Sequence, residues 1–197
     1  SLGRVNFGVG VGWYREEFEA LGYNFTERGR RTNDGLAIIK SLWAQQKTTI
    51  DGPYYSFVNA QTGPKPLQSS GPPIYIGGNT PAALSRLAKF GDVWHPYKVS
   101  PDALRDSIPV LQAALEKNGR SASNFPIAVK VPLTFQDGPP GKGQCVSEGR
   151  PQDIIHGLKR YIENGATEFC FDIMNETRSN ALDTMSRFTQ EVRPHLQ

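Results

Sequence analysis

The sequence predicts an α/β fold in which five short strands are each followed by a helix. Short apolar runs recur along the chain, and after each run apolar residues are spaced as on one face of a helix. This alternation implies parallel strands joined by right-handed crossovers. An open doubly wound sheet and a (β/α)8 barrel both fit. Because a barrel usually takes about 250 residues, the 197 residues here leave a truncated barrel and a complete five-stranded sheet as the alternatives.

The first strand is predicted over residues 4–11, where an apolar face alternates with a face of Asn6, Gly8, Gly10 and Gly12. It follows Ser1 almost at once and no initiating Met precedes it, so we expect further sequence upstream. A short helix is predicted over residues 13–21. A second is predicted over residues 26–43, with Thr26 as its N-cap and a buried stripe of Leu36, Ile39 and Trp43.

The middle of the chain holds an irregular stretch and then regular elements. Residues 48–73 are rich in proline and tyrosine, which predicts an ordered excursion with a short hairpin. Residues 74–76 and 93–94 read as brief strands. Thr80-Pro81 and Ser100-Pro101 each supply an N-cap and an N1 proline, which predicts that helices begin there.

The last third repeats the pattern. A strand is predicted over residues 127–135, a long loop over residues 136–149, a helix from Pro151, and a final strand over residues 169–173. The closing helix is predicted to bury a stripe of Leu182, Met185, Phe188 and Val192.

Composition excludes several classes of protein. With 38% hydrophobic and 21% charged residues, the chain can bury a core and is not disordered. The net charge of +3 is scattered, so we expect no nucleic-acid partner. The one tight basic cluster should form surface ion pairs: Arg28, Arg30 and Arg31 with Glu16, Glu17 and Glu27.

Cysteine count and apolar runs bear on the compartment. Cys145 and Cys170 cannot build a disulfide framework or a four-ligand zinc site, and no pair of histidines has metal-ligand spacing. No apolar run approaches about 20 residues, and no signal peptide is recognisable. We therefore expect no metal site, no membrane partner and a cytoplasmic location.

Two glycine-rich segments are candidate binding sites. Three glycines on one face of the first strand cost roughly 1.5–3 kcal/mol in backbone entropy, so either a flat ligand or a closely packed helix needs the missing side chains. Gly77, Gly78 and Asn79 stand between a strand and the amino end of a helix, where backbone N–H groups and the helix dipole suit a phosphate. An ordinary strand-to-helix turn is the alternative.

The third predicted strand ends on Trp94 and His95, at the edge where both architectures place active sites. His95 could act as an acid, a base or a ring contact, but a single histidine is more often structural. Lys130 lies on the minor face of its strand and could point into a barrel, although a side chain extending to solvent is the simpler reading. No nucleophile or phosphate-loop motif was found.

Several motifs, taken in order, resemble the luciferase-like monooxygenase superfamily, and within it the bacterial coenzyme F420-dependent oxidoreductases. The motifs are Phe7-Gly8-Val9-Gly10-Val11-Gly12-Trp13, Glu16-Glu17-Phe18, Leu21-Gly22, Arg28-Gly29-Arg30-Arg31, Leu42-Trp43, Gly52-Pro53-Tyr54-Tyr55, Pro64-Lys65-Pro66-Leu67-Gln68, Pro72-Pro73-Ile74-Tyr75-Ile76-Gly77-Gly78 and Gly91-Asp92-Val93-Trp94. The likeness is strongest through Trp94 and looser beyond it.

The resemblance implies a partial (β/α)8 TIM barrel corresponding to strands four to eight, with the first three strand–helix units absent. Residues 1–197 would be one barrel domain, and residues 48–73 would be the insertion before its second strand. The implied activity is flavin- or deazaflavin-dependent redox chemistry, by hydride transfer or oxygenation, on a small organic substrate. The implied cofactor is coenzyme F420 or FMN, and the full-length form could be a homo-oligomer.

The resemblance also assigns roles to residues. Gly77, Gly78 and Asn79 would hold the cofactor phosphate. Gly10, Gly12 and Trp13 would lie beside its ring or ribityl chain, and Trp94 and His95 near its phosphate or tail. In the sugar-phosphate dehydrogenase branch a catalytic Glu follows the glycine run, where this chain has Trp13, so no catalytic acid is assigned. Two other functions remain open: a flavodoxin-like phosphate-binding module and a non-catalytic barrel remnant.

Overall fold

A computed structural model describes residues 1–142, 145–173 and 177–196. The chain divides into two compact units, residues 1–93 and 94–197. The first unit contains β1 (Phe7–Val9), α1 (Arg15–Ala20), a 3-10 turn (Phe25–Glu27), α2 (Arg28–Ala44), β2 (Thr48–Asp51), β3 (Ser56–Ala60), β4 (Ile74–Gly77) and α3 (Pro81–Phe90), and β5 (Val93–His95) begins at its last residue.

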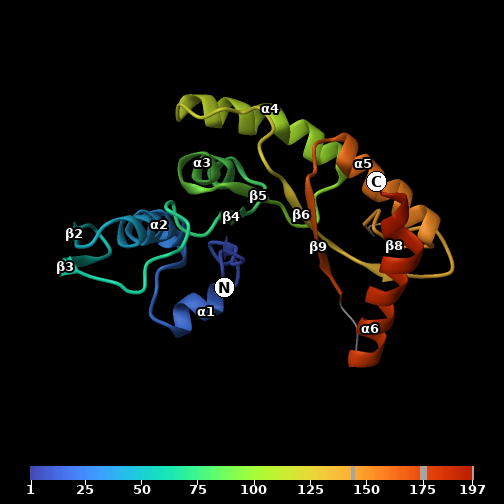
Figure 1. The fold of residues 1–197 in the computed structure, drawn as a ribbon, viewed down its shortest axis with the longest axis horizontal. Helices are drawn as coiled ribbons and strands as arrows, with labels where there is room; N and C mark the ends of the chain where they lie inside the picture. The colour runs from blue at the N-terminus through green and yellow to red at the C-terminus, as the bar shows by residue number, and fades with distance from the viewer. Residues whose placement is uncertain (143–144, 174–176, 197) are drawn as a thin grey trace. The chain divides into compact units, whose positions relative to one another are not determined.

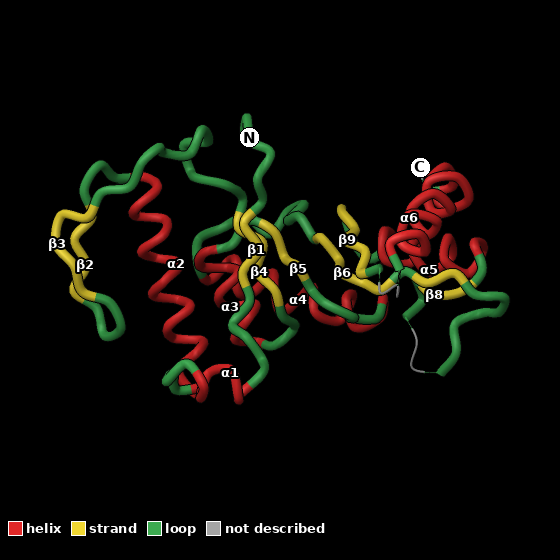
Figure 2. The backbone as a smooth tube through the Cα atoms, turned by 90° about the horizontal axis from the view of Figure 1, so that it is seen from below, coloured by secondary structure: helices red, strands yellow, loops and turns green. Residues whose placement is uncertain are grey.

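The sheet of the first unit is parallel, with the order β1-β4-β5. Ile74 and Ile76 of β4 are 1% exposed because Leu84 and Leu87 of α3, themselves 2% and 0% exposed, cover that strand. The predicted hairpin is confirmed: β2 and β3 pair antiparallel within residues 48–73. It lies on the side of α2 away from β1 and β4 (Figures 1 and 2).

The helix starts were predicted correctly where the N-cap residue stands directly before the helix. Thr80 Oγ1 accepts a hydrogen bond from the Ala83 N–H at 3.3 Å, and Ser100 Oγ accepts one from the Ala103 N–H at 3.1 Å. The N-cap predicted at Thr26 is wrong. Asn24 Oδ1 accepts the Thr26 N–H at 3.0 Å and starts the 3-10 turn that runs into α2 at Arg28.

Other expectations for the first unit need correction. The first strand covers Phe7–Val9 instead of residues 4–11, because it is paired only opposite β4, and Val5 is 48% exposed. Of the predicted ion pairs, Arg30 meets Glu27 at 3.6 Å. The other two arginines lie over aromatic rings instead: Arg28 is 3.8 Å from the Phe25 ring centroid, and Arg31 is within 5.3 Å of Tyr23, Tyr54 and Tyr55.

The second unit pairs two parallel strands and packs helices against them. Its elements are α4 (Pro101–Lys117), β6 (Ala128–Pro132), β7 (Thr134–Phe135), β8 (Glu148–Gly149), α5 (Pro151–Glu163), β9 (Glu168–Asp172), α6 (Arg178–Arg187), a π-helical turn (Phe188–Val192) and a 3-10 turn (Arg193–His195). β6 and β9 run in parallel register over five residue pairs. Figures 1 and 2 show α5 and α6 on the same side of these strands.

Two predictions for this unit need correction. The loop predicted over residues 136–149, of which 143–144 lie outside the described residues, is too long at its end, because Glu148–Gly149 form β8, which pairs in parallel with β7. The closing helix does not bury its whole stripe: Leu182 and Met185 are 53% and 51% exposed, whereas Val192 is fully buried. α6 gives way to a π-helical turn at Phe188, which rotates the following residues relative to a continuous α-helix.

Candidate functional site

The carboxyl ends of β1 and β4 bring the two glycine-rich segments together. Val9 is the parallel partner of Ile76. Gly10 follows Val9 and Gly77 ends β4, so the two glycines emerge at the same edge of the sheet. This edge is where ligands bind to parallel α/β sheets.

The glycine face of β1 borders open space. A Cβ atom built on Gly8 or Gly10 would meet nothing within 4 Å among the described residues, and both glycines are exposed. Close helix packing, the alternative explanation, therefore does not account for these two glycines in the structure. Gly12 differs, because its φ is +81° and a Cβ there would lie 2.8 Å from the Phe18 ring.

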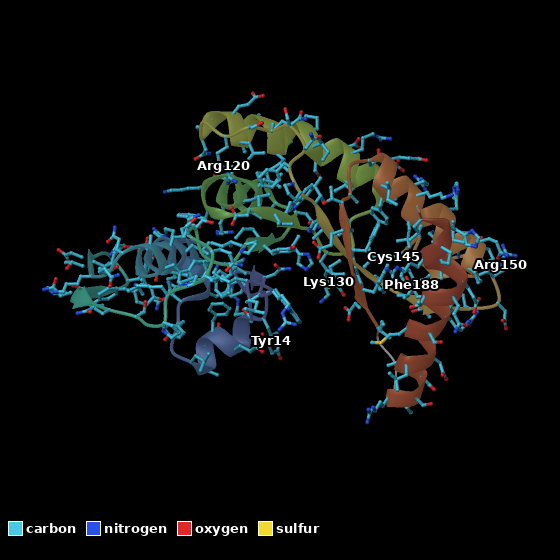
Figure 3. The ribbon with its side chains drawn as sticks, in the orientation of Figure 1. Tyr14, Arg120, Lys130, Cys145, Arg150 and Phe188 are labelled. Carbon is cyan, nitrogen blue, oxygen red and sulfur yellow. The ribbon has the colours of Figure 1, made fainter. Side chains whose placement is uncertain are left out.

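Aromatic side chains follow the glycine run. Trp13 is 84% exposed and Tyr14 is 45% exposed, and their ring centroids are 5.4 Å apart with an interplanar angle of 47°. Figure 3 shows Tyr14 beside α1. Aromatic surface this exposed, next to open space at Gly10, is suited to stacking against a flat ring.

The turn from β4 to α3 has the geometry that an anion site needs. Gly78 has a φ of +106°, and a Cβ there would lie 3.0 Å from the Cβ of Ala83. Gly78, Asn79 and Thr80 are exposed. They precede the amino end of a ten-residue helix, whose dipole attracts negative charge.

The other two predicted site residues lie in the second unit. Trp94 is fully buried, and its backbone N–H donates to the Pro126 carbonyl at 3.0 Å. Its indole has no surface for a ligand to touch in this structure, so Trp94 packs as a core residue. His95 is half-buried, and its Nδ1 lies 2.7 Å from the Ala128 carbonyl oxygen.

Sequence reasoning considered Lys130 but missed its two polar partners in the second unit, Asp172 and Tyr97. Asp172 Oδ2 accepts a hydrogen bond from the Tyr97 hydroxyl at 3.3 Å and lies 3.8 Å from Lys130 Nζ. Tyr97 follows β5, Asp172 ends β9, and Lys130 lies in β6. The available signal was position, because polar residues at the carboxyl ends of parallel strands are candidates for function.

The glycine-rich edge of the first unit has the chemistry to hold an organic cofactor. Within the described ranges, no group of three or more His, Cys, Asp or Glu side chains could hold a metal ion. The glycines at the β1 and β4 ends leave room beside the backbone and precede a helix amino end, which fits a planar ring carrying a phosphate. Among the described residues, every helix is too short or too polar to cross a membrane.

Two curated relatives act with different cofactors. The "FMNH(2)-dependent dimethylsulfone monooxygenase" of Pseudomonas putida is 29% identical over 122 residues, which are 60% of this chain and 34% of that protein. The "F420-dependent glucose-6-phosphate dehydrogenase" of Microbacterium testaceum is 33% identical over 141 residues, which are 68% of this chain and 40% of that protein. The chain thus spans about a third to two fifths of the length of these relatives.

Solved structures share the fold over nearly the whole chain. An "F420-dependent secondary alcohol dehydrogenase in complex with an F420-acetone adduct" matches with a TM-score of 0.80 and 18% identity, covering 99% of this chain and 70% of that one. The monooxygenase RslO1 from Streptomyces bottropensis matches with a TM-score of 0.81 and 16% identity, covering 100% and 70%. The α/β fold is therefore that of these enzymes.

The family model described as "Luciferase-like monooxygenase" matches residues 1–139. That match takes in the first unit completely and reaches past β7 in the second. The chain belongs to the luciferase-like monooxygenase family.

Proposed function

We propose that this protein is a flavin- or deazaflavin-dependent oxidoreductase that performs two-electron redox chemistry on a small organic substrate. One observation carries the proposal: Gly10 and Gly77 emerge together at the carboxyl ends of β1 and β4, with open space beside Gly8 and Gly10. The FMNH2-dependent and F420-dependent relatives support both cofactors as candidates.

Different residues of the first unit bind different parts of the cofactor. Gly77, Gly78 and Asn79 hold the cofactor phosphate at the amino end of α3, where the helix dipole stabilises negative charge. Gly10 and Gly12 let the ring or ribityl chain approach the backbone, and Trp13 covers it. His95, of the second unit, is assigned to the phosphate or tail.

When bound, a deazaflavin supplies hydride transfer, and FMN supplies hydride transfer or oxygen activation. The contribution of the chain is to hold ring and substrate in a fixed geometry and to exclude water, and such positioning accounts for much of the rate in cofactor enzymes. No side chain of the first unit is assigned as an acid or base.

The proposed architecture is the part of a (β/α)8 barrel that corresponds to strands four to eight, with residues 1–197 as one domain and 48–73 as an insertion. The parallel sheet order β1-β4-β5, with strands added in one direction, is compatible with it. A cytoplasmic location and a homo-oligomeric full-length form complete the proposal.

Comparing FMN with riboflavin tests the phosphate site directly. We expect FMN to bind this chain more tightly than riboflavin by about tenfold or more, because the phosphate adds charge-assisted hydrogen bonds. Quenching of flavin fluorescence on titration measures both affinities, and the absorbance of coenzyme F420 that survives gel filtration measures the deazaflavin.

Two glycine variants separate the two parts of the site. Gly10→Val fills the space beside the ring and should weaken FMN and riboflavin equally, whereas Gly78→Ala should weaken FMN alone. Gly138→Val is the matched control, because a Cβ at Gly138 also meets nothing within 4 Å among the residues that the structure describes. If neither flavin nor F420 binds, the oxidoreductase proposal fails. If inorganic phosphate binds and Gly10→Val has no effect on FMN, a phosphate-binding module replaces it.

A further inference from the structure

We propose that Lys130, Asp172 and Tyr97, here called the Lys130 cluster, form a binding site for an uncharged small molecule that carries hydroxyl groups. The inference rests on the proposed function, since it names the class of substrate that the oxidoreductase would take. It is argued from the second unit alone.

The strand register places the cluster on one face of the β6–β9 pair. Lys130 is the parallel partner of Cys170, and Pro132 is the partner of Asp172, so the side chains of these four residues share a face. Cys170 is exposed on that face.

The opposite face is closed by helices. Phe169 packs edge-on against Tyr161 of α5 with ring centroids 6.1 Å apart, and Phe171 packs against Phe188 with centroids 4.6 Å apart. Figure 3 shows Lys130 on the other side of the strands from Phe188. The two faces are therefore chemically distinct: one is core, and the other carries the polar cluster.

The contacts within the cluster are loose. Asp172 Oδ2 lies 3.8 Å from Lys130 Nζ and 3.3 Å from the Tyr97 hydroxyl, and Lys130 Nζ is 5.1 Å from the Tyr97 ring centroid. Charge-assisted hydrogen bonds are normally about 2.7–2.9 Å long. An oxygen atom of a ligand could therefore bridge Lys130 and Asp172 with shorter bonds to each than they make to one another.

The side chains of the cluster are exposed enough to contact a ligand and do not form a buried ion pair. The side chains of Lys130 and Asp172 are 38% and 24% exposed. An exposed ion pair of this kind contributes about 0–1 kcal/mol to stability. These three polar side chains, one within β6, one at the end of β9 and one shortly after β5, thus give the fold little stability, while they offer a donor, an acceptor and a hydroxyl at one place.

The balance of charge selects the ligand. Lys130 and Asp172 cancel, so an anion that reached Lys130 would also meet the Asp172 carboxylate, and a cation that reached Asp172 would meet the ammonium. Lys98 adds a positive charge beside Tyr97: its side chain hydrogen-bonds to Tyr97, and its Nζ lies 5.3 Å from the ring centroid, so the charged probes below decide between a neutral ligand and an anion. A hydroxyl satisfies both partners at once, because it donates to Asp172 and accepts from Lys130.

Cys170 provides a readout that needs no cofactor. It stands opposite Lys130 in the register, so a molecule bound at the cluster should shield its thiol. We would follow alkylation of this chain by iodoacetamide with mass spectrometry, adding propane-1,2-diol as the probe and acetate or methylammonium as charged probes of similar size. Cys145, which is half-buried, is the internal reference.

The expected result is saturable protection of Cys170 by the diol and little protection by the charged probes. Lys130→Met, Asp172→Asn and Tyr97→Phe should each raise the midpoint of protection, by about tenfold for the two charged residues, since each removes a charge-assisted hydrogen bond. Glu168→Gln is the matched control, because Glu168 lies on the same face at the other end of β9.

Several outcomes would overturn the inference. Stronger protection by acetate makes the cluster an anion site, and protection that survives both charge-removing variants places the probe elsewhere. Absence of protection by any probe leaves only an inter-strand ion pair. If a single variant does not fold, the double variant Lys130→Met/Asp172→Asn, which leaves no lone charge, takes its place. Flavin titration is measured separately, so a chain that binds flavin without diol protection retains the proposed function and loses the substrate class.

Discussion

The Nε of Arg86 in α3 donates a hydrogen bond of 2.6 Å to Oδ1 of Asn33 in α2. Its Nη2 also donates to the Gly29 carbonyl at 3.2 Å, and Arg86 is only 7% exposed. Burial lowers the pKa of the Arg86 guanidinium below its usual value. The pair therefore joins α2 to α3, the helix whose amino end forms the proposed phosphate site.

The Arg86 contact predicts a loss of stability in the first unit. Arg86→Leu should destabilise it by about 2 kcal/mol, because the Asn33 amide and the Gly29 carbonyl are left without their partner. Urea unfolding monitored by circular dichroism measures the change. Arg105→Leu is the control: Arg105 is 58% exposed, and its ion pairs with Asp102 and Asp106 should contribute less than about 1 kcal/mol. Equal losses for the two variants would contradict this account.

Substitution of Gly10 by alanine should increase stability and weaken flavin binding. Because a Cβ at Gly10 meets nothing within 4 Å, Gly10→Ala should stabilise the fold by about 0.4–1 kcal/mol through the unfolded chain, yet weaken flavin binding. Thermal unfolding and flavin titration on the same variant measure the two effects. Gly138→Ala, also facing open space, should gain stability without loss of binding. A Gly10 variant that binds flavin as well as the parent would remove Gly10 from the site.

The sequence predicted correctly those features that depend on residues next to one another in the chain. Thr80 and Ser100 cap helices that begin at the next residue, and both N-caps were predicted correctly. The N-cap at Thr26 failed because Asn24, only two residues earlier, takes the Thr26 N–H for a 3-10 turn. Strand ends failed for another reason: β1 stops at Val9 because its pairing with β4 stops there.

Contacts between distant residues account for most of what the sequence did not predict. Arg31 was expected to meet a nearby glutamate, but it lies over Tyr54 and Tyr55, which follow β2. Trp94 was expected at a ligand and is buried in the core. The approach of Lys130 to Asp172 follows from the register of β6 with β9, which the spacing of residues along the chain cannot fix.

Asp153 predicts a pH-dependent contribution to α5. Hydrogen bonding from the Arg150 side chain at 2.7 Å, together with the Arg150 N–H, lowers the pKa of the Asp153 carboxyl. A lowered folded-state pKa means that the stabilisation is present above the unfolded-state pKa, near 4, and is lost as pH falls through the folded value.

Asp153→Asn should therefore lower the melting temperature at neutral pH, and the difference from the parent chain should shrink as the pH is reduced below about 4. Differential scanning calorimetry across the acid range measures it. Asp106→Asn, whose side chain is 68% exposed on α4, is the comparison. A difference for Asp153→Asn that stays constant across the range would mean that the capping geometry, and not the charge, is what stabilises the helix.

At Gly157 in α5, helix propensity and packing predict opposite effects of an alanine substitution on stability. Alanine is preferred to glycine inside a helix by about 0.8–1 kcal/mol, so Gly157→Ala would be stabilising on propensity alone. A Cβ at this position, however, would clash with the carbonyl oxygen of Val146, a backbone atom that cannot rotate away. We expect a net destabilisation of about 1–3 kcal/mol, the usual range for overpacking.

Gly35→Ala in α2, where a Cβ meets nothing within 4 Å among the described residues, should instead show the full gain in stability from helix propensity. Chemical unfolding of the two variants tests this opposition of sign, and a stabilised Gly157 variant would mean that the segment before β8 does not approach α5 as closely as the structure has it.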